Sequence, residues 1–234
     1  MYKNYEEFIS SVEAIEGVEI QNFAQTENGL VIPLLKKGKG QVKILVVAAV
    51  HAREYITTPL VLELLKEYNP SKNVRFDVVP MLNIDGVFMS LNDESERLRK
   101  SNARGADLNC NFNALWGEGK GNRFGYASLS GDDGSGRMGA CPESEAEAES
   151  VGRRIRLYDY SLVVAYHSKG EEVYYGFGAD TRYKEYAERY ADYLGYTLKT
   201  TPYSAGGLKD YFTLRTGRLG LTVEVGNNGL EHPI

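Results

Sequence analysis

The stretch VVAAVHAREYITTPL, residues 46–60, decides the fold because it joins a buried strand to a helix through a short polar segment. The strand begins upstream: QVKILVVAAV, residues 41–50, is rich in β-branched and apolar residues, as is typical of a strand buried on both faces. The pair Thr58-Pro59 suits the first turn of a helix, which we expect to continue to about residue 69. His51 stands between the two elements, at the carboxyl end of the strand.

The same alternation continues along the chain. Ser144 and Glu147 have the spacing of a capping box and predict a helix start, and the sequence NIDG at 83–86 indicates a turn. Because strands and helices alternate, we predict an α/β fold: a single domain over residues 1–234, with a mixed, largely parallel central sheet flanked by helices. The further strands are expected at 74–82, 161–167 and 219–225, and the further helices over 1–17, from 144 onward and over 181–194.

One long stretch, residues 113–140, has eight glycines and no apolar periodicity. Loops of this length usually form functional rims or disordered insertions. Trp116, near its start, is expected to serve in packing. The two cysteines, Cys110 and Cys141, lack zinc-finger spacing, so we expect two reduced thiols.

Composition excludes several classes of protein. Hydrophobic residues make up 42% of the chain and charged residues 25%, which is ordinary for a globular domain. The net charge is −5 and no long Lys/Arg run occurs, so neither nucleic acid nor an anionic membrane surface is an expected partner. No 18-residue apolar segment is present, and the N-terminal helix carries acids without an apolar core typical of a secretory signal. We therefore expect a cytoplasmic protein; the oligomeric state is not predicted.

Side chains suited to metal binding follow the predicted strands. In open α/β sheets, ligands gather at the carboxyl ends of strands, where His51, His167 and Glu224 all lie. Glu54 follows His51 by three residues, so one imidazole and one carboxylate can converge on a single ion as the chain leaves the strand. Two histidines, one glutamate and water form the ligand set of a catalytic zinc site with an open position. Glu224 would then act as a general base for the water and a general acid for the leaving nitrogen.

A structural role is the competing explanation for each of these residues taken alone. A single HxxE tetrapeptide arises often by chance, and a histidine that closes a strand is commonly a satisfied core residue. Glu224 within an apolar strand is harder to explain in this way, because an unpaired buried carboxylate is costly. The combination of features at three strand ends favours a site.

The motifs HAREY (51–55), YHSKG (166–170) and LTVEVG (221–226) resemble those of the zinc carboxypeptidase superfamily, the carboxypeptidase A-like metallopeptidases. NIDG at 83–86 resembles that family's Asn-Pro-Asp-Gly turn, with Ile84 in place of proline. The resemblance implies that His51, Glu54 and His167 hold one Zn²⁺ per chain and that Glu224 is the general base.

Within the superfamily, the segments 100–119 and 166–177, PESEAE (142–147) and SAGGLKDYF (204–212) are similar to bacterial γ-D-glutamyl-diaminopimelate peptidases and murein peptide amidases. This resemblance implies a small murein-derived peptide as substrate, cleaved between γ-D-Glu and the diamino acid. It also places Arg53 beside the substrate groove. The cation that stabilises the oxyanion is either Lys100, by the register of the NARG motif, or Arg99, one residue earlier; a solvated surface pair is the alternative for both.

The sequence departs from the family pattern around the expected substrate-binding residues. Asn109 is present, but Cys110 replaces the arginine that digestive carboxypeptidases use to hold a terminal carboxylate. Gly206-Gly207 align with the family's paired glycines, which puts Tyr203 one position away from the mobile tyrosine. Lys209 then falls at the bottom of the pocket for the residue after the scissile bond and suits a substrate carboxylate; an exposed lysine early in a helix is the alternative.

Three functional hypotheses remain from the sequence. The first is a zinc metallopeptidase that hydrolyses the γ-D-Glu–diamino acid bond of murein peptides. The second is a cytoplasmic zinc carboxypeptidase or amidase that acts on ordinary L-peptides or acylated amino acids. The third, a non-catalytic peptide-binding module, is disfavoured because all three ligands and Glu224 are present.

Overall fold

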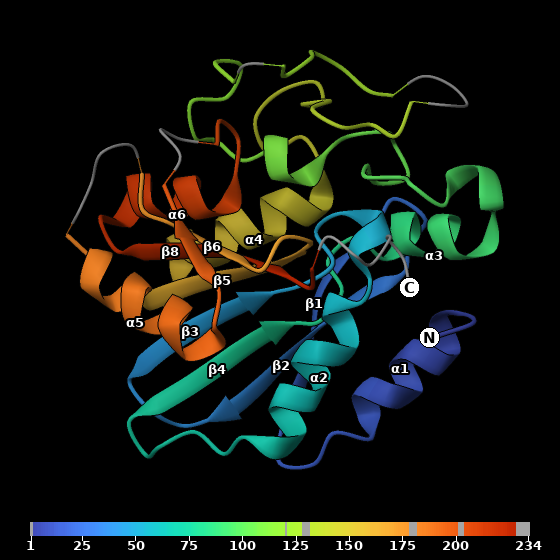
Figure 1. Ribbon diagram of the computed structural model, residues 1–234. Helices are drawn as coiled ribbons and strands as arrows, with labels where there is room; N and C mark the ends of the chain where they lie inside the picture. Colours follow the sequence, from blue (N-terminus) through green and yellow to red (C-terminus); the bar gives the residue numbers. More distant parts are fainter. Residues whose placement is uncertain (1, 120, 128–131, 178–181, 201–203, 228–234) are drawn as a thin grey trace.

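The computed structural model describes residues 2–119, 121–127, 132–177, 182–200 and 204–227. Eight strands form one sheet, and helices connect or cover them (Figure 1). The strands are β1 Glu19–Gln25, β2 Val31–Gly38, β3 Val42–Val47, β4 Val74–Val79, β5 Tyr160–Ser168, β6 Glu172–Tyr175, β7 Thr197–Lys199 and β8 Leu219–Val225. The α-helices are α1 Tyr5–Glu13, α2 Thr57–Glu67, α3 Ile84–Asn92, α4 Ala146–Leu157, α5 Lys184–Leu194 and α6 Leu208–Thr216, and the 3₁₀ turns are η1 Ala52–Glu54, η2 Glu94–Glu96 and η3 Leu108–Cys110.

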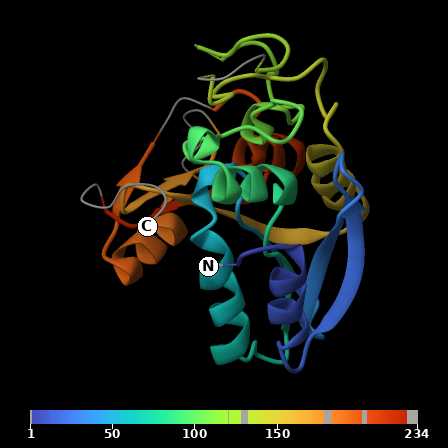
Figure 2. The same cartoon turned by 90° about the vertical axis from the view of Figure 1, so that its right-hand side faces the viewer.

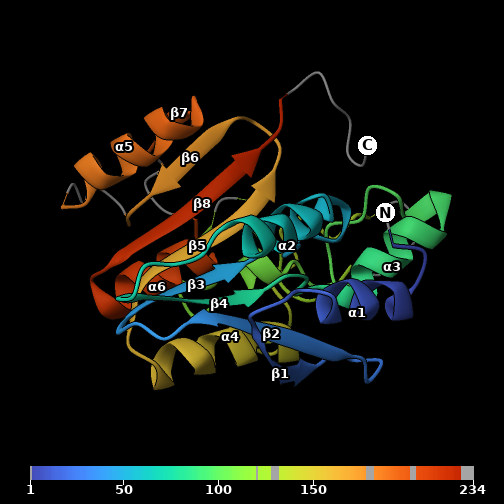
Figure 3. The same ribbon diagram turned by 90° about the horizontal axis from the view of Figure 1, so that it is seen from below.

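The strand order is β1-β2-β4-β3-β5-β8-β6-β7 (Figure 3). The four central neighbours β4, β3, β5 and β8 run parallel, so their carboxyl ends share one edge of the sheet. On one side β2 joins β4 antiparallel and β1 follows it; on the other, β6 joins β8 antiparallel and pairs with β7 in parallel. The predicted mixed α/β sheet flanked by helices is confirmed.

Helices cover both faces of the sheet. In Figure 1, α4 and α6 lie above the strands, whereas α1, α2 and α5 lie below them. The described parts of the glycine-rich stretch, 113–119, 121–127 and 132–140, lie over the face that carries α4 and α6, as the rotated view in Figure 2 also shows. Among the described residues, no helix combines the length and apolar character needed to cross a bilayer.

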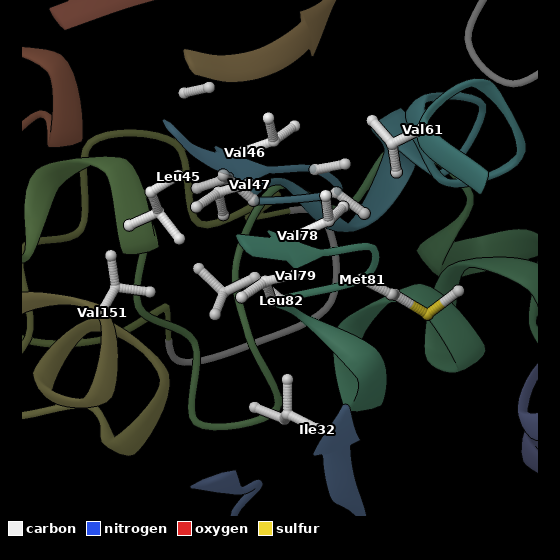
Figure 4. Packing of buried hydrophobic residues seen from close by; sticks show 14 of the residues in the cluster. Ile32, Leu45, Val46, Val47, Val61, Val78, Val79, Met81, Leu82 and Val151 are labelled. Carbon is white, nitrogen blue, oxygen red and sulfur yellow. The ribbon is translucent and has the colours of Figure 1, made fainter. Parts of the chain in front are cut away.

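The core lies against the central strands. Leu45 and Val47 of β3 and Val79 of β4 are completely buried on one face of the sheet, and the alternate residues Val46 and Val78 are buried on the other (Figure 4). Val61 of α2 lies on one side of the strands and Val151 of α4 on the other. The sheet is thus packed on both faces, which explains why 41–50 has a continuous rather than an alternating apolar pattern.

Two predicted local structures are wrong in detail. The segment predicted as a turn is the start of helix α3. Asn83 caps this helix, because its side-chain oxygen accepts from the Gly86 N–H at 3.1 Å. The capping box at Ser144 does not form, because the helix begins two residues later and the Ser144 hydroxyl donates to the Glu145 carboxylate at 2.8 Å. A side-chain acceptor close by in the fold competes successfully with the local cap.

Strands β1 and β2 were missed by the sequence patterns. The strands lie at one edge of the sheet, with a register irregularity near Asn22 and with Pro33 inside β2. β1 is the edge strand and has mixed polarity, and in β2, which pairs with β1 and β4, Pro33 interrupts the apolar run; neither periodicity nor composition therefore distinguished the two strands from loops. Gly195, by contrast, ends α5 in the left-handed conformation that its sequence position predicts.

A group of buried carboxylates lies between α3, α4 and the segment after η2. Glu145 and Glu147 are almost fully buried, and the Asn102 amide donates to both, at 2.8 Å and 3.5 Å. Burial, reinforced by the charges of Glu145 and Asp85, raises the pKa of Glu147 to about 7. The ionised form of Glu147 is therefore disfavoured in the folded protein.

This arrangement predicts a pH-dependent stability. Because the folded pKa of Glu147 lies above the ordinary value of 4.5, its contribution to stability is fully present below pH 4.5 and is lost as the pH rises through about 7. Glu147→Gln should therefore raise the free energy of unfolding by about 2–3 kcal/mol near pH 8 and change it little near pH 5. Denaturant unfolding at both pH values measures the difference. Glu149→Gln, at a more exposed position of the same helix, is the control; equal effects of the two substitutions at both pH values would contradict the prediction.

Candidate metal centre and active site

The chain leaves β3 through a locked turn. Ala49 adopts a left-handed conformation with φ of 47°, and its N–H is held by the Thr57 hydroxyl oxygen at 2.8 Å. The same hydroxyl donates to the Glu54 carbonyl at 2.8 Å. Asn83 supports the turn from the next strand, with its side-chain amide donating to the Val50 carbonyl at 3.3 Å. These bonds fix the direction in which His51 leaves the sheet.

The η1 turn brings Glu54 back to His51. In a 3₁₀ turn, side chains three residues apart eclipse one another. The Glu54 Oε1 atom accordingly lies 2.7 Å from His51 Nδ1, and its Oε2 atom lies 2.9 Å from His167 Nδ1. The two Nδ1 atoms are 3.1 Å apart. One carboxylate and two imidazoles, the second from the end of β5, thus point their ligand atoms at one location.

The cluster is buried and strongly coupled. His51, Glu54 and His167 are each at most 4% exposed. Burial by itself would raise the pKa of Glu54, but the two neighbouring imidazoles hold it well below its usual range. Burial likewise opposes charge on His51, yet the Glu54 and Asp107 carboxylates outweigh it and raise the pKa of His51 to about 9. The cavity-facing cluster therefore attracts a positive charge.

Asp107 holds His51 from the opposite side. The carboxylate oxygen Oδ1 of Asp107 lies 3.2 Å from His51 Nε2 and also accepts from the Asn109 N–H at 3.0 Å. Its other oxygen accepts from the Gly136 N–H at 3.0 Å. Burial would raise the pKa of Asp107, but His51 and these donors hold it well below its ordinary value. Sequence reasoning missed this residue, although an acid two positions before Asn109 in the small, apolar run GADLN was a usable signal.

The donor set fits zinc. The ligand atoms of His51, Glu54 and His167 all lie within 4.8 Å of one another. Two imidazole nitrogens and one carboxylate are the protein ligands of many catalytic zinc sites, which leave further positions open. The outer nitrogen of His51 meets a carboxylate, as is usual for a metal-bound histidine. Among the described residues, no other group of three such side chains meets the same geometric condition.

Glu224 and Lys100 lie next to this cluster. Glu224 is on β8 directly opposite His167 of β5 in the sheet register. Burial, with a contribution from Glu54, raises the pKa of Glu224, whereas the His167, His51 and Lys100 charges oppose that rise. The Lys100 charge also acts on His51 and Asp107. Lys100 also lines the same cavity as His51.

A cavity of about 530 Å³ opens beside the cluster. Ligand sites in proteins commonly have volumes of this order. His51 and Lys100 lie on its wall together with residues from the glycine-rich stretch 113–140 and from the segment before α6. The described lining residues are His51, Lys100, Asp107, Asn109, Cys110, Glu118, Gly119, Asn122, Ser204 and Ala205.

The two cations predicted for the oxyanion lie in different surroundings. Arg99 is 8% exposed, and its guanidinium donates to Glu96 at 2.6 Å and to the Asn102 carbonyl at 2.9 Å. It lines a separate depression, which it shares with Arg53. The Arg53 guanidinium donates there to the Leu98 carbonyl at 3.0 Å and to Asp133 at 3.3 Å. Of these three basic side chains, Lys100 alone is among the described residues that line the cavity at His51.

The remaining predicted substrate residues have distinct positions. Asn109 lines the cavity, and its side-chain oxygen accepts from the Leu208 N–H at 3.0 Å. Lys209 is buried; its ammonium donates to the Gly176 carbonyl at 2.6 Å and pairs with Asp210. Tyr203 lies outside the described residues. The substrate roles of Asn109, Lys209, Arg53 and Tyr203 stay predictions.

The two cysteines, Cys110 and Cys141, are free thiols, as the sequence predicts. The Cys110 thiol lines the cavity and donates to the Asn122 side-chain oxygen at 3.6 Å. Burial raises the pKa of the Cys110 thiol, so the group stays protonated and neutral.

A family model for zinc carboxypeptidases matches residues 9–232 of this chain. The chain belongs to the zinc carboxypeptidase family. The family's members bind zinc, as its description states, and the cluster of His51, Glu54 and His167 is where this chain would hold the ion. The resemblance drawn from the sequence motifs is thereby confirmed at the level of the family.

Curated relatives include a γ-D-glutamyl-L-diamino acid endopeptidase of Lysinibacillus sphaericus, 28% identical and matched over 87% of this chain and 59% of that protein. Human mast cell carboxypeptidase A is 22% identical over 76% of this chain and 47% of its own length. The chain thus spans about half to three-fifths of these relatives.

Solved structures share the fold. Carboxypeptidase A of Helicoverpa armigera superposes with a TM-score of 0.77 at 18% identity, covering 98% of this chain and 66% of that one. The murein-tripeptide amidase MpaA of Escherichia coli O157 superposes with a TM-score of 0.66 at 22% identity, covering 92% of this chain and 83% of that one.

Asp107 provides a test of the metal centre that does not require catalysis. Asp107→Asn keeps the shape of the side chain but removes the charge that orients His51, so the zinc affinity should fall about 10–100-fold. Competition with a chromophoric chelator measures the affinity. His167→Ala, which removes a ligand, should abolish stoichiometric zinc binding, and circular dichroism checks that both variants fold. Unchanged affinity in both variants would place the metal elsewhere.

Proposed function

We propose that this protein is a zinc-dependent peptidase that hydrolyses the amide bond between γ-D-Glu and a diamino acid, diaminopimelate or lysine, in small murein-derived peptides. The observation that carries the hydrolytic part is the convergence of His51, Glu54 and His167 beside Glu224 and Lys100 at one wall of a cavity. The cytoplasmic location predicted from the sequence is part of the same proposal.

The chemistry divides between the metal and the chain. His51, Glu54 and His167 would hold a zinc ion, which would supply Lewis acidity for the scissile carbonyl and for water. Glu224 accepts the proton of the attacking water as the new C–O bond forms, and it delivers that proton to the nitrogen as the C–N bond breaks. Burial raises the Glu224 pKa, which brings it closer to neutrality and suits both transfers. The Lys100 ammonium stabilises the charge on the carbonyl oxygen.

The choice of bond is supported by two observations. The Lysinibacillus relative is named for cleavage at γ-D-glutamyl-L-diamino acid bonds, and it matches 87% of this chain. Within the cavity, position 110 carries a neutral thiol in place of a guanidinium, so the group that holds a free terminal carboxylate in digestive carboxypeptidases is missing here. Asn109, in the same wall, remains to hold a carboxylate of the leaving residue. These features favour a specialised peptide over any free C-terminus.

The direct experiment is incubation of the zinc-loaded protein with L-Ala-γ-D-Glu-meso-diaminopimelate, with products identified by mass spectrometry. Free diaminopimelate should appear with the parent protein, and Glu224→Gln should lower kcat by about 10²–10⁴-fold because it removes the proton acceptor. Zinc stoichiometry is measured on both proteins, so that metal loss is not mistaken for loss of the base.

The α-linked isomer, L-Ala-α-L-Glu-diaminopimelate, separates the competing hypotheses. Cleavage of this isomer alone would favour a carboxypeptidase or amidase that acts on ordinary L-peptides. Folded, zinc-loaded protein without activity on either isomer would favour a peptide-binding module.

We expect opposite effects from substitutions of Lys100 and Arg99. Lys100→Met should lower kcat about 10²–10³-fold with little change in unfolding, because it removes charge stabilisation that arises in the transition state. Arg99→Met should instead lower the free energy of unfolding, because Arg99 is buried and paired with Glu96. Steady-state kinetics and denaturant unfolding of both variants measure this. The assignment reverses if Arg99→Met lowers kcat in a fully folded protein while Lys100→Met does not.

A further inference from the structure

We propose that Glu118 selects substrates whose leaving residue carries a second ammonium group. The inference rests on the proposed function, since Asn109 is assigned there to the leaving residue and lies in the wall of the same cavity as Glu118. It assigns a residue that discriminates between substrates by their leaving residue, a task that the catalytic residues do not perform.

The charges around the cavity leave one acid without a partner. Asp107 is engaged by His51 and by two backbone N–H groups, and the Lys100 charge acts on His51 and Asp107. Glu118 is exposed on the cavity wall, and no side chain in the described part of the protein hydrogen-bonds or pairs with its carboxylate. Among the described lining residues, Glu118 is therefore the acid available to a ligand cation.

Cys110 and Asn122, which line the same cavity, do not neutralise this carboxylate. Position 110 carries a protonated thiol, which donates to the Asn122 side chain at 3.6 Å. Asn122 in turn donates to the Ala205 carbonyl at 3.1 Å, so both ends of its amide are engaged within the protein. An arginine at position 110 would bring a guanidinium into this cavity and make it suitable for a carboxylate. With a thiol there, the region around Glu118 suits a positively charged group.

The part of the glycine-rich stretch that carries Glu118 is anchored to the segment before α6. The Gly206 N–H donates to the Ala114 carbonyl at 2.7 Å, and the Glu118 N–H closes a turn onto the Leu115 carbonyl at 3.0 Å. Gly119 allows the close approach: a Cβ there would lie 2.7 Å from Asn122 Cγ and 3.1 Å from Ala205 Cβ. The backbone that carries Glu118 is thus tied into a turn on the cavity wall.

A diamino acid matches this arrangement. Diaminopimelate and lysine place an ammonium several bonds beyond the atom that becomes the leaving nitrogen, and a carboxylate accepts charge-assisted hydrogen bonds from such a group. A neutral or acidic leaving residue makes no such bond, and an acidic one meets like charge. The structure therefore distinguishes lysine from norleucine, and diaminopimelate from 2-aminopimelate, by the amino group alone.

The test compares kcat/KM for matched pairs of γ-D-Glu peptides that end in lysine or norleucine, and in diaminopimelate or 2-aminopimelate. The parent protein should favour the amine-bearing member of each pair about fivefold or more, a modest factor because Glu118 is exposed. Glu118→Gln should reduce that preference to about one, and Glu118→Lys should reverse it. The ratio within a pair cancels any general effect of a variant on folding or zinc loading.

Binding of the free diamino acid gives a second readout. Calorimetry on the zinc-loaded parent protein and on Glu118→Gln should show weaker binding of lysine to the variant and equal, weak binding of norleucine to both. Glu67→Gln, an exposed acid at the end of α2, has the same change in net charge and serves as the matched control. A preference unchanged in Glu118→Gln, or equally reduced in Glu67→Gln, overturns the proposal.

The outcome is separable from that of the proposed function. If the parent protein cleaves only α-linked peptides, the proposed bond is wrong, and the same lysine and norleucine pairs in the α-linked series still test Glu118. If the γ-linked peptides are cleaved and the amino group has no influence, the bond is right and the role of Glu118 is wrong.

Discussion

The Glu54 carboxylate, buried between two imidazoles, is the constraint on which the rest of the site depends. An ionised carboxylate removed from water is expensive unless opposite charge and hydrogen bonds compensate it. Here His51 and His167 approach its two oxygens at 2.7 Å and 2.9 Å, and Asp107 supports His51 from behind. The arrangement concentrates donor atoms where a divalent cation completes the compensation. Two turns make this convergence possible: the strained turn at Ala49, directly after β3, and the 3₁₀ turn that follows it.

The parallel centre of the sheet brings together residues that lie far apart in the sequence. β3, β5 and β8 are neighbours, so His51, His167 and Glu224 reach the same edge although more than one hundred residues separate the first from the others. The segment that carries Lys100 and Asp107 is not part of the sheet. It is held against that edge by backbone bonds, among them the Ala52 N–H to the Lys100 carbonyl at 3.2 Å and the Lys100 N–H to the Asp133 carbonyl at 2.7 Å.

The rigid and variable parts of the site have different chemical duties. The strand ends carry His51, His167 and Glu224, where packing on both faces of the sheet fixes their positions. The segments outside the sheet supply other groups of the cavity wall, among them the Cys110 thiol of η3 and the Glu118 carboxylate of the glycine-rich stretch. A framework of this kind keeps its strand ends in place while the groups on its loops set the surroundings of a ligand.

The sequence by itself determined the fold class and the central strands, because both depend on local patterns such as continuous apolar runs. It also singled out His51, Glu54 and His167, which the structure brings together, and Glu224 beside them; their roles in metal binding and catalysis stay predictions. Strands β1 and β2 escaped it because pairing across the sheet decides them, and the starts of α3 and α4 escaped it because single side-chain hydrogen bonds, at Asn83 and Ser144, decide where these helices begin. Only the tertiary structure revealed Asp107 behind His51, turned Arg99 away from the cavity, placed Lys100 on its wall with His51, and left Glu118 unpaired on the cavity wall. These outcomes depend on which side chains meet across the fold, and spacing along the chain contains no information about such encounters.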